Sequence, residues 1–258
     1  MARNAVSFLV LAVLAVLGCG LAVGDAGPAR AIVGGGVAAQ GQFPWMVRLS
    51  MGCGGTLTAP RVVLTAGHCV TGAGPNISIG VTAGAADLTS PTAITARSVS
   101  VFRPAAFNGE THGNDWALIR LDRPLGLPTL PLSPAGADDQ GTFTILGWGV
   151  TGEAGRKQQT KLRYGNVPTV PDAECATDYR TIGVALVPAA SICAGKRGID
   201  TCQGDSGGPL VRPDGHGGWV QVGIVSWGYG CARKDYPGVY TQISTFRAAI
   251  LAATRTLS

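Results

Sequence analysis

A serine surrounded by glycines carries the clearest chemical signal in the sequence. Ser206 lies in the run Gly-Asp-Ser-Gly-Gly-Pro that spans residues 204–209. A nucleophilic serine needs close approach of a substrate carbonyl and backbone N–H groups that are free to face the developing oxyanion, and glycines permit both. The motif therefore indicates a hydrolase that works through a serine nucleophile.

The order of the catalytic residue types along the chain separates two classes of serine hydrolase. The run around Ser206 also fits Gly-x-Ser-x-Gly, the nucleophile elbow of α/β-hydrolases, whose acid and histidine come well after the serine. Here only His216 follows, ten residues on, with Asp214 crowded beside it. A better pair lies upstream, with His68 in Leu-Thr-Ala-Gly-His-Cys and Asp115 in Asn-Asp-Trp-Ala-Leu. The order His68, Asp115, Ser206 is that of the chymotrypsin class of proteases.

These motifs and several shorter ones resemble those of secreted trypsin-like serine proteases of the chymotrypsin family, bacterial trypsins above all. The resemblance extends from residue 32 to residue 257. The further strings that carry it are Ile-Val-Gly-Gly at 32–35, Asp-Thr-Cys-Gln at 200–203, Ser-Trp-Gly at 226–228 and Pro-Gly-Val-Tyr at 237–240. It implies a serine endopeptidase that is made as a zymogen and hydrolyses peptide bonds after Arg or Lys through an acyl-enzyme intermediate.

The resemblance implies a catalytic role for each of the three residues. Ser206 would attack the scissile carbonyl, His68 would take its proton and return it to the leaving amine, and Asp115 would hold the imidazole tautomer. The backbone N–H groups of Gly204 and Ser206 would form the oxyanion hole, in which one donor is typically worth about 3 kcal/mol. The alternatives are a histidine satisfied within the core for His68 and a cap at a strand edge for Asp115.

The resemblance also implies which residues select the substrate. Asp200 precedes the nucleophile by six residues and would form the floor of the primary pocket, where a buried carboxylate selects Arg or Lys. Gly228 and Gly238 would form the pocket walls, and Ser226, Trp227 and Gly228 would pair with the substrate as an added strand. The alternatives are a solvated loop position for Asp200 and a plain core position for Trp227.

A zymogen of this family is activated by a new amino terminus, here Ile32, whose ammonium would pair with the carboxylate of Asp205. That ion pair would order the pocket and the oxyanion hole. The sequence departs from the usual pattern, because Ala31 separates Arg30 from Ile32. We therefore expect activation by a protease that cuts after Ala31, or by trimming after a first cut.

The first 31 residues predict a leader that is removed. Arg3 precedes an apolar stretch over residues 8–17, and small residues follow at 22–24, which is the layout of a secretory signal peptide. We therefore expect a signal peptide at 1–24, a short propeptide at 25–31, and a secreted, extracellular peptidase domain at 32–258. The alternatives are an uncleaved membrane anchor, for which the apolar run is shorter than the ~20 residues that a span needs, and lipidation at Cys19.

Seven cysteines leave one without a partner. Removal of Cys19 with the leader leaves six, which allow 15 pairings and suit an oxidising compartment where disulfides persist. The resemblance implies the pairs Cys53–Cys69, Cys175–Cys193 and Cys202–Cys231.

The elements that must position these residues are predicted to be β-strands. Glycine accounts for 39 of 258 residues, and short apolar runs alternate with turn residues, which favours strands over helices. The runs are at 45–49, 61–64, 117–121, 143–146 and 220–225, and helical periodicity appears only near the end, at about 245–256. The resemblance implies two packed antiparallel Greek-key β-barrels with the active site in the cleft between them. We expect them at about 32–123 and 141–243, with a connection at 124–140.

The charge distribution and the available ligand side chains indicate which kinds of molecule the protein binds. The net charge of +5 is scattered, so no basic run points to nucleic acid. We expect no cofactor and no membrane association after leader removal, but rather polypeptide substrates with Arg or Lys before the scissile bond, proteinaceous inhibitors and a monomer. Calcium is poorly supported, since the loop at 82–90 offers only Asp87, and Asp172 is accompanied by Ser191 and Gln242 rather than by acids.

Two other functions remain possible from the sequence. One is a catalytically silent protease-like binding protein, against which the intact His68, Asp115 and Ser206 count. The other is an unrelated secreted esterase, which chain order and Asp200 oppose.

Overall fold

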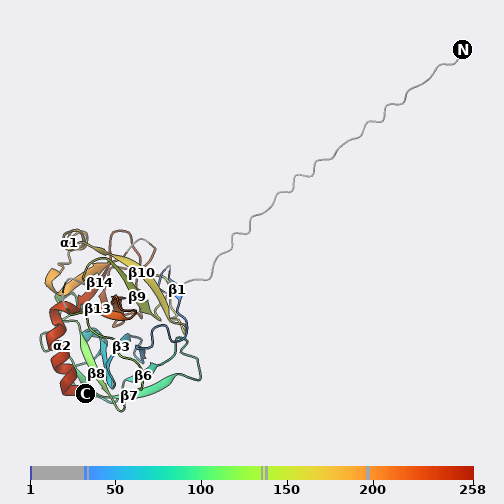
Figure 1. Ribbon diagram of the computed structural model, residues 1–258. Coiled ribbons are helices and arrows are strands. Elements are labelled where there is room, and N and C mark those ends of the chain that lie inside the picture. The colour runs from blue at the N-terminus through green and yellow to red at the C-terminus, as the bar shows by residue number, and fades with distance from the viewer. Residues whose placement is uncertain (2–31, 34, 135, 137–138, 196–197) are drawn as a thin grey trace.

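The computed structural model describes the chain except residues 2–31, 34, 135, 137–138 and 196–197. The predicted signal peptide and propeptide, with Cys19, Arg30 and Ala31, lie outside the described residues. The described chain forms two closed antiparallel β-barrels of six strands each and a C-terminal helix (Figure 1). This is the chymotrypsin-like fold that the resemblance implies.

The first barrel is built from strands between residues 46 and 121. Their bounds are β2 Met46–Leu49, β3 Gly54–Ala59, β4 Val62–Thr65, β6 Gly80–Ala83, β7 Ile94–Phe102 and β8 Ala117–Leu121, with the short β5 Gly74–Pro75 paired to β7. The strands pair in the order β7-β6-β2-β3-β4-β8, and the pairing of β7 with β8 closes the ring. Two 3₁₀ turns, η1 Gly67–Cys69 and η2 Glu110–His112, follow β4 and precede β8.

The second barrel repeats this arrangement between residues 142 and 242. Its strands are β9 Thr142–Gly147, β10 Arg163–Val170, β11 Ser191–Ala194, β12 Pro209–Pro213, β13 Trp219–Trp227 and β14 Gly238–Gln242. They pair in the order β10-β11-β14-β13-β12-β9, and β9 pairs with β10 to close the ring. The 3₁₀ turn η4 Pro188–Ala190 precedes β11.

Apolar side chains fill the barrels because a six-stranded ring has room for little else. All four residues of β4 are buried, and in β8 only Arg120 is partly exposed. All five apolar runs found in the sequence coincide with strands, namely β2, β4, β8, β9 and β13. The longest strand without such a run is β7, in which Ser98 and Ser100 interrupt the apolar pattern.

The two ends of the described chain each reach across to the more distant barrel. The two-residue strand β1 Gly36–Val37 pairs with β10 of the second barrel. At the other end, helix α2 Ile243–Leu257 runs along the outside of the molecule beside β8 (Figure 1), and its Ile243 and Ile250 join the core of the first barrel. The ends therefore tie the barrels together and help to hold the cleft between them.

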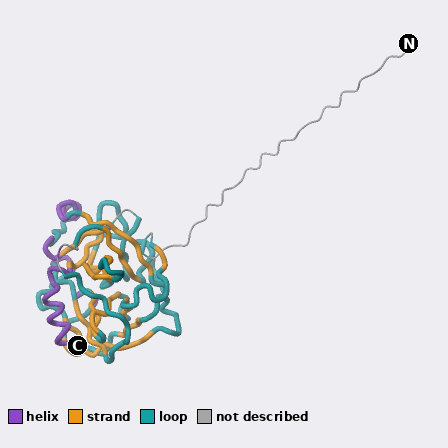
Figure 2. Tube along the Cα trace, viewed as in Figure 1, coloured by secondary structure: helices purple, strands orange, loops and turns teal. Residues whose placement is uncertain are grey.

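A second helix was not predicted from the sequence. Helix α1 Asp172–Arg180 lies at the periphery of the strands (Figure 2). Its nine residues are mostly polar and bury only Cys175 and Tyr179, so they carry no apolar helical stripe of the kind that sequence reasoning detects. Among the described residues, no helix has the length and apolar character that a membrane crossing requires.

Candidate active site

Asp115 and His68 form a tightly bonded pair at the edge of the first barrel. Asp115 precedes β8 and is fully buried, while His68 lies on η1 after β4. The Nδ1 of His68 is 2.8 Å from Asp115 Oδ2, and the backbone N–H of His68 donates to Asp115 Oδ1 at 2.8 Å. Two bonds to one carboxylate fix both the backbone and the ring of the histidine, so Nε2 is left to face the cleft.

The second barrel also holds Asp115 in place. Ser226 Oγ donates to Asp115 Oδ2 at 2.5 Å, and Thr241 Oγ1 donates to the backbone carbonyl of Asp115 at 2.8 Å. These bonds join strands β13 and β14 to the acid that precedes β8. The carboxylate is therefore anchored from both barrels, and its position depends on their relative alignment.

The surroundings of His68 favour its protonated form. Burial alone would lower the pKa of His68, but the hydrogen bond that its ring donates to Asp115 and the negative charges of Asp115 and Glu110 outweigh it and raise the pKa above its usual value. A histidine in this environment is a stronger base than a free imidazole. It is therefore suited to take a proton from a nearby hydroxyl.

Ser206 sits on a tight turn that only glycines allow. Gly204 and Gly207 have φ values of 94° and 77°, and a Cβ at Gly207 would collide with Thr65 Oγ1. The Ser206 carbonyl accepts from the N–H of Gly54 in β3 at 2.8 Å, which binds the turn to the first barrel. Among the described residues, the N–H groups of Gly204 and Ser206 donate to no protein acceptor. Both donors are thus available to an oxyanion.

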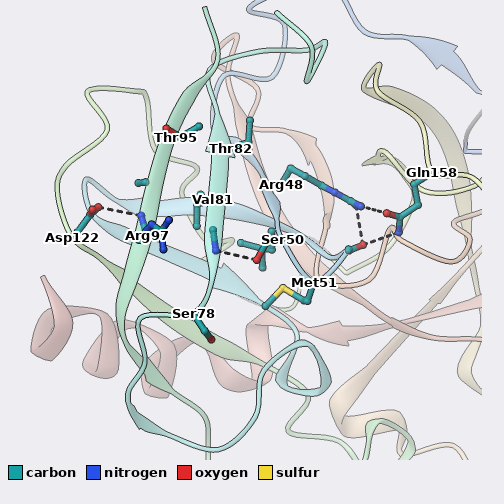
Figure 3. Close-up of a pocket in the computed structure, with 14 residues that line it drawn as sticks. Arg48, Ser50, Met51, Ser78, Val81, Thr82, Thr95, Arg97, Asp122 and Gln158 are labelled. Carbon is teal, nitrogen blue, oxygen red and sulfur yellow. Dashed lines mark hydrogen bonds between the residues drawn. The ribbon is translucent and has the colours of Figure 1, made fainter. Parts of the chain in front are cut away.

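A network behind the turn binds the peptide that lies between these two donor peptides, and the sequence analysis missed it. Arg48 of β2 donates from Nη1 to the carbonyl oxygens of Gly52 and Gly204, at 2.9 and 3.0 Å. Gln158 bonds both to the Arg48 guanidinium and, at 3.0 Å, to Gly52 (Figure 3). A cavity of about 910 Å³ outside the first barrel is lined on one side by Arg48, Gly52 and Gln158. The peptide between Gly204 and Asp205 is thus held at both ends, because its carbonyl accepts from Arg48 and its N–H donates to the carbonyl of Cys202.

A smaller cavity of about 320 Å³ brings most of the predicted site residues together, but Asp115, Gly204 and Gly238 do not line it. His68 and Glu110 line it from the first barrel, and Ser206 and Asp200 from the second. The strand segment 226–228 forms a further side of the same cavity. Residues separated by up to 160 positions in the sequence, which the sequence analysis expects to act in catalysis and specificity, thus line one cavity.

Asp200 is a buried acid at this cavity, so the alternative of a solvated loop acid is wrong. It is 4% exposed, and its carboxylate accepts from the N–H groups of Thr201 at 2.8 Å and Ala232 at 2.9 Å. Burial raises the pKa of Asp200 to about 7, although these N–H bonds oppose the shift. Gly238 packs against it, since a Cβ there would lie 2.8 Å from Asp200 Oδ1. A side chain at 238 would therefore displace the carboxylate.

Asp205 is a second buried acid on the same loop. It is fully buried, and it accepts from the N–H groups of Gly149 at 2.7 Å and Cys202 at 2.9 Å. Burial raises the pKa of Asp205 to about 6, while those two bonds and the charge of Arg48 act in the opposite direction. Asp205 does not face the cavity that contains Ser206.

Ile32 lies nearby in the second barrel. Its side chain is fully buried among the core residues of that barrel, and the next residue, Val33, bridges to Asp200 through a 3.2 Å bond from its N–H to the Asp200 carbonyl. The backbone of Ile32 has a φ of 49°, which is unusual for a β-branched residue. Ile32 is therefore adjacent in sequence to a residue that bonds to the backbone of Asp200.

The side chains of Ser226 and Trp227 make contacts within the protein in addition to any contact with a substrate. Ser226 directs its hydroxyl to Asp115, so only its backbone is left for a substrate strand. Trp227 is half-buried, lines the cavity, and packs edge-on against Tyr179 with ring centroids 4.6 Å apart. It therefore contributes to the core and to the cavity wall at once. Gly228 lines the cavity beside it.

Three disulfides are present, and they are the pairs that the resemblance implies. They join Cys53 to Cys69, Cys175 to Cys193, and Cys202 to Cys231. The first connects the residue before β3 to the turn that carries His68, and the third connects the loop before Ser206 to the segment after β13. Two of the three disulfides thus brace the walls of the cleft.

Metal ligation has weak support at the positions considered in the sequence. The described cluster of potential ligands Cys53, His68 and Cys69 has both thiols in a disulfide. Asp172, Ser191 and Gln242 do line one cavity of about 220 Å³, yet the Gln242 amide donates at 2.7 Å to Asp139. Asp87 accepts from Thr89 within its own turn.

Comparison with known proteins agrees with this geometry. The Trypsin family model matches residues 32–250 of the chain. The chain belongs to the trypsin family. Among similar members, a trypsin-like protease of Streptomyces glaucescens is 51% identical over 228 residues, covering 88% of this chain and 83% of the relative. Trypsin beta of Drosophila erecta is 35% identical over 228 residues, covering 85% and 87%. Trypsin alpha of Drosophila melanogaster is 32% identical over 234 residues, covering 88% of each.

Membership of the trypsin family makes this chain a serine endopeptidase that acts on protein substrates. Two residues at the site of this trypsin-family chain escaped the sequence analysis. Arg48 left a signal as a lone cation within the apolar run at 45–49, and Glu110 as an acid five residues before Asp115. Neither pattern says which distant atoms the side chain will meet.

Proposed function

We propose that this chain is a secreted endopeptidase that cleaves polypeptides after Arg or Lys. The observation that carries this specificity is Asp200, a buried carboxylate at the cavity that contains Ser206. Among the described residues it has backbone N–H partners and one distant hydroxyl, but no cation. A substrate guanidinium or ammonium would supply the missing charge, whereas an apolar side chain would leave the buried anion uncompensated at several kcal/mol.

Peptide hydrolysis would proceed by attack of Ser206 on the scissile carbonyl. His68 takes the hydroxyl proton as the new C–O bond forms, and Asp115 stabilises the resulting imidazolium. The N–H groups of Gly204 and Ser206 bind the oxyanion, and His68 then protonates the leaving amine as the C–N bond breaks. Water repeats the sequence on the acyl-enzyme and restores Ser206.

Activity would depend on processing of the chain. We propose removal of a signal peptide at 1–24 and a propeptide at 25–31, which leaves a peptidase domain at 32–258. The new ammonium of Ile32 would pair with the buried carboxylate of Asp205. N-terminal sequencing checks the cut, and fully active enzyme that begins at Ala31 would contradict it.

The setting of this protease would be extracellular. Three disulfides persist only where the environment is oxidising. The partners proposed are polypeptides with Arg or Lys before the scissile bond and proteinaceous inhibitors that fill the same pocket. The enzyme would act as a monomer, because the cavity is complete within one chain.

Initial rates on matched ester and amide substrates with Arg, Lys or Phe at the scissile position test the proposal, with Ser206→Ala as the control. Arg and Lys substrates should be turned over about 10²–10³ times faster than Phe, as expected for several kcal/mol. Equal rates for Phe and Arg would overturn the role of Asp200. Ester cleavage without amide cleavage would favour an esterase, and no turnover by correctly processed protein would favour a silent binding protein.

A further inference from the structure

Glu110 is an acid at the rim of the catalytic cavity that the reaction does not use. It begins η2, between β7 and β8, and lines the cavity opposite the loop of Asp200. Its Oε2 lies 3.9 Å from Nδ1 of His68, and its side chain is 49% exposed. The carboxylate therefore stands at the mouth of the cleft, next to the catalytic base and open to an incoming molecule.

The charge of Glu110 is not neutralised by a fixed cation. Within the part of the chain that the structure describes, it forms an ion pair with neither lysine nor arginine, and its one ion-pair partner is His68, which is charged only when protonated. Arg103 instead donates a hydrogen bond to the carbonyl of Val70 at 2.8 Å, and its guanidinium lies 5.0 Å from the centroid of the Phe107 ring. The first-barrel side of the cavity thus presents a negative charge whenever His68 is in its neutral, reactive state.

The geometry of an extended substrate brings one side chain to this carboxylate. Successive side chains of an extended strand point to opposite faces. If the side chain before the scissile bond enters the cavity towards Asp200, the preceding side chain points away from Asp200. Asp200 lines the cavity from the second barrel and His68 and Glu110 line it from the first, so a side chain that points away from Asp200 is directed towards the first-barrel side.

We propose that Glu110 selects a Lys or Arg at the substrate position immediately before the primary Arg or Lys, so that the enzyme prefers pairs of basic residues. This inference rests on the proposed function, because it places the primary side chain against Asp200. A half-exposed carboxylate contributes modestly, so the preference is about threefold to fivefold in kcat/KM. Asp200 and Glu110 would then each bind one of two consecutive basic side chains of the substrate, within one cavity.

The test uses peptide amides that differ only at the second position, with Arg-Arg, Ala-Arg and Glu-Arg before the scissile bond. Values of kcat/KM, normalised by active-site titration, are compared for the processed wild-type enzyme, Glu110→Gln and the control Glu174→Gln. Glu174 is an exposed acid on α1 and does not line the catalytic cavity. We expect the order Arg-Arg, Ala-Arg, Glu-Arg in the wild type and in the control, and its collapse in Glu110→Gln.

Salt provides a second readout that a structural role would not change. The preference for Arg-Arg over Ala-Arg should shrink between 0.1 and 1 M salt, as the Debye length falls from about 10 to about 3 Å. An unchanged Arg-Arg to Ala-Arg ratio in Glu110→Gln would overturn the inference, as would an equal loss on every substrate, since that would mean that Glu110 acts on His68 alone. Equal rates for Ala-Arg and Ala-Phe would instead refute the proposed function itself.

Discussion

Asp200 and Asp205 are two buried acids on one loop with different surroundings. Each accepts two backbone N–H bonds, and burial raises the pKa of both. Asp205 is sealed inside the protein and feels the charge of Arg48, whereas Asp200 faces the catalytic cavity with no cation among its described neighbours. The same residue type is thus enclosed by the protein at one position and open to a cavity at the other.

The comparison teaches that the partner of a buried charge decides its role. Burial of an unpaired carboxylate is unfavourable, and a protein compensates either with internal donors and cations or with a ligand. At Asp205 the compensation is internal, so the charge orders the loop around Ser206. At Asp200 no cation is present among the described residues, and under the proposed specificity a cationic substrate side chain would supply the compensation.

The largest effect is expected from Asp205→Asn. If Asp205 balances the ammonium of Ile32, this change leaves a buried cation unpaired, at about 3–5 kcal/mol. We expect kcat/KM for an Arg substrate to fall by about 10²–10³-fold or more, with retention of the disulfides and the secondary structure. Steady-state kinetics on fully processed protein measure it, and activity within tenfold of the wild type would show that Asp205 has no such partner.

The next largest effect is expected from Asp200→Asn. Asparagine keeps the shape but not the charge, so kcat/KM for Arg and Lys substrates should fall by about 10²-fold or more, while Phe substrates keep their low rate. The Arg to Phe ratio is the measurement, because it is insensitive to a partial loss of folded enzyme. A ratio that stays at its wild-type value would remove the distinction between the two acids.

A smaller effect is expected from Arg48→Met. This change removes the guanidinium from the Gly204 carbonyl and from the vicinity of Asp205. Hydrogen bonds to charged groups are worth about 1.5–3 kcal/mol, and partial relaxation of the turn leaves a loss of about tenfold. It should appear in kcat rather than in KM, since oxyanion binding belongs to the transition state. Recovery in Arg48→Lys would support the interpretation, and a change confined to KM would contradict it.

The smallest effect is a difference in pH dependence between two substrates. His68 must be neutral to accept a proton, so kcat/KM falls as pH drops through its raised pKa. Protonation of Asp200, whose pKa is about 7, removes the partner of a cationic substrate in the same range. The profile for an Arg substrate should therefore fall more steeply below pH 7 than that for its uncharged citrulline analogue. Parallel acid limbs would mean that Asp200 stays ionised.

The sequence identified the class of protease more completely than it identified the contacts that hold the site residues in place. The motifs around His68, Asp115 and Ser206 are local strings, and their order identified the class of protease before any contact was known. The barrels follow from apolar runs such as that of β8, because closed rings bury nearly every side chain. The disulfides came from the resemblance and not from the spacing of the cysteines.

What the sequence could not predict depends on distant contacts. Arg48 bonds to a carbonyl 156 residues away, and nothing in its apolar run specifies that partner. Ser226 lies at a register shift between β13 and β14. The alternation of side chains between the two faces of the strand therefore does not predict that its hydroxyl points to Asp115. Glu110 becomes a cavity residue only because a loop of the first barrel meets the second.

The positive φ of Ile32 has a consequence for activation. A left-handed conformation at a β-branched residue stores about 1–3 kcal/mol of strain. This torsion is defined by the carbonyl carbon of Ala31, so it exists only while the bond between residues 31 and 32 is intact. Hydrolysis of that bond, as proposed, abolishes the torsion and leaves the isoleucine side chain free to keep its place in the core. Cleavage would then relieve the strain only in the state in which Ile32 is packed in the core. The free energy of that state would fall relative to the state in which Ile32 is outside the core.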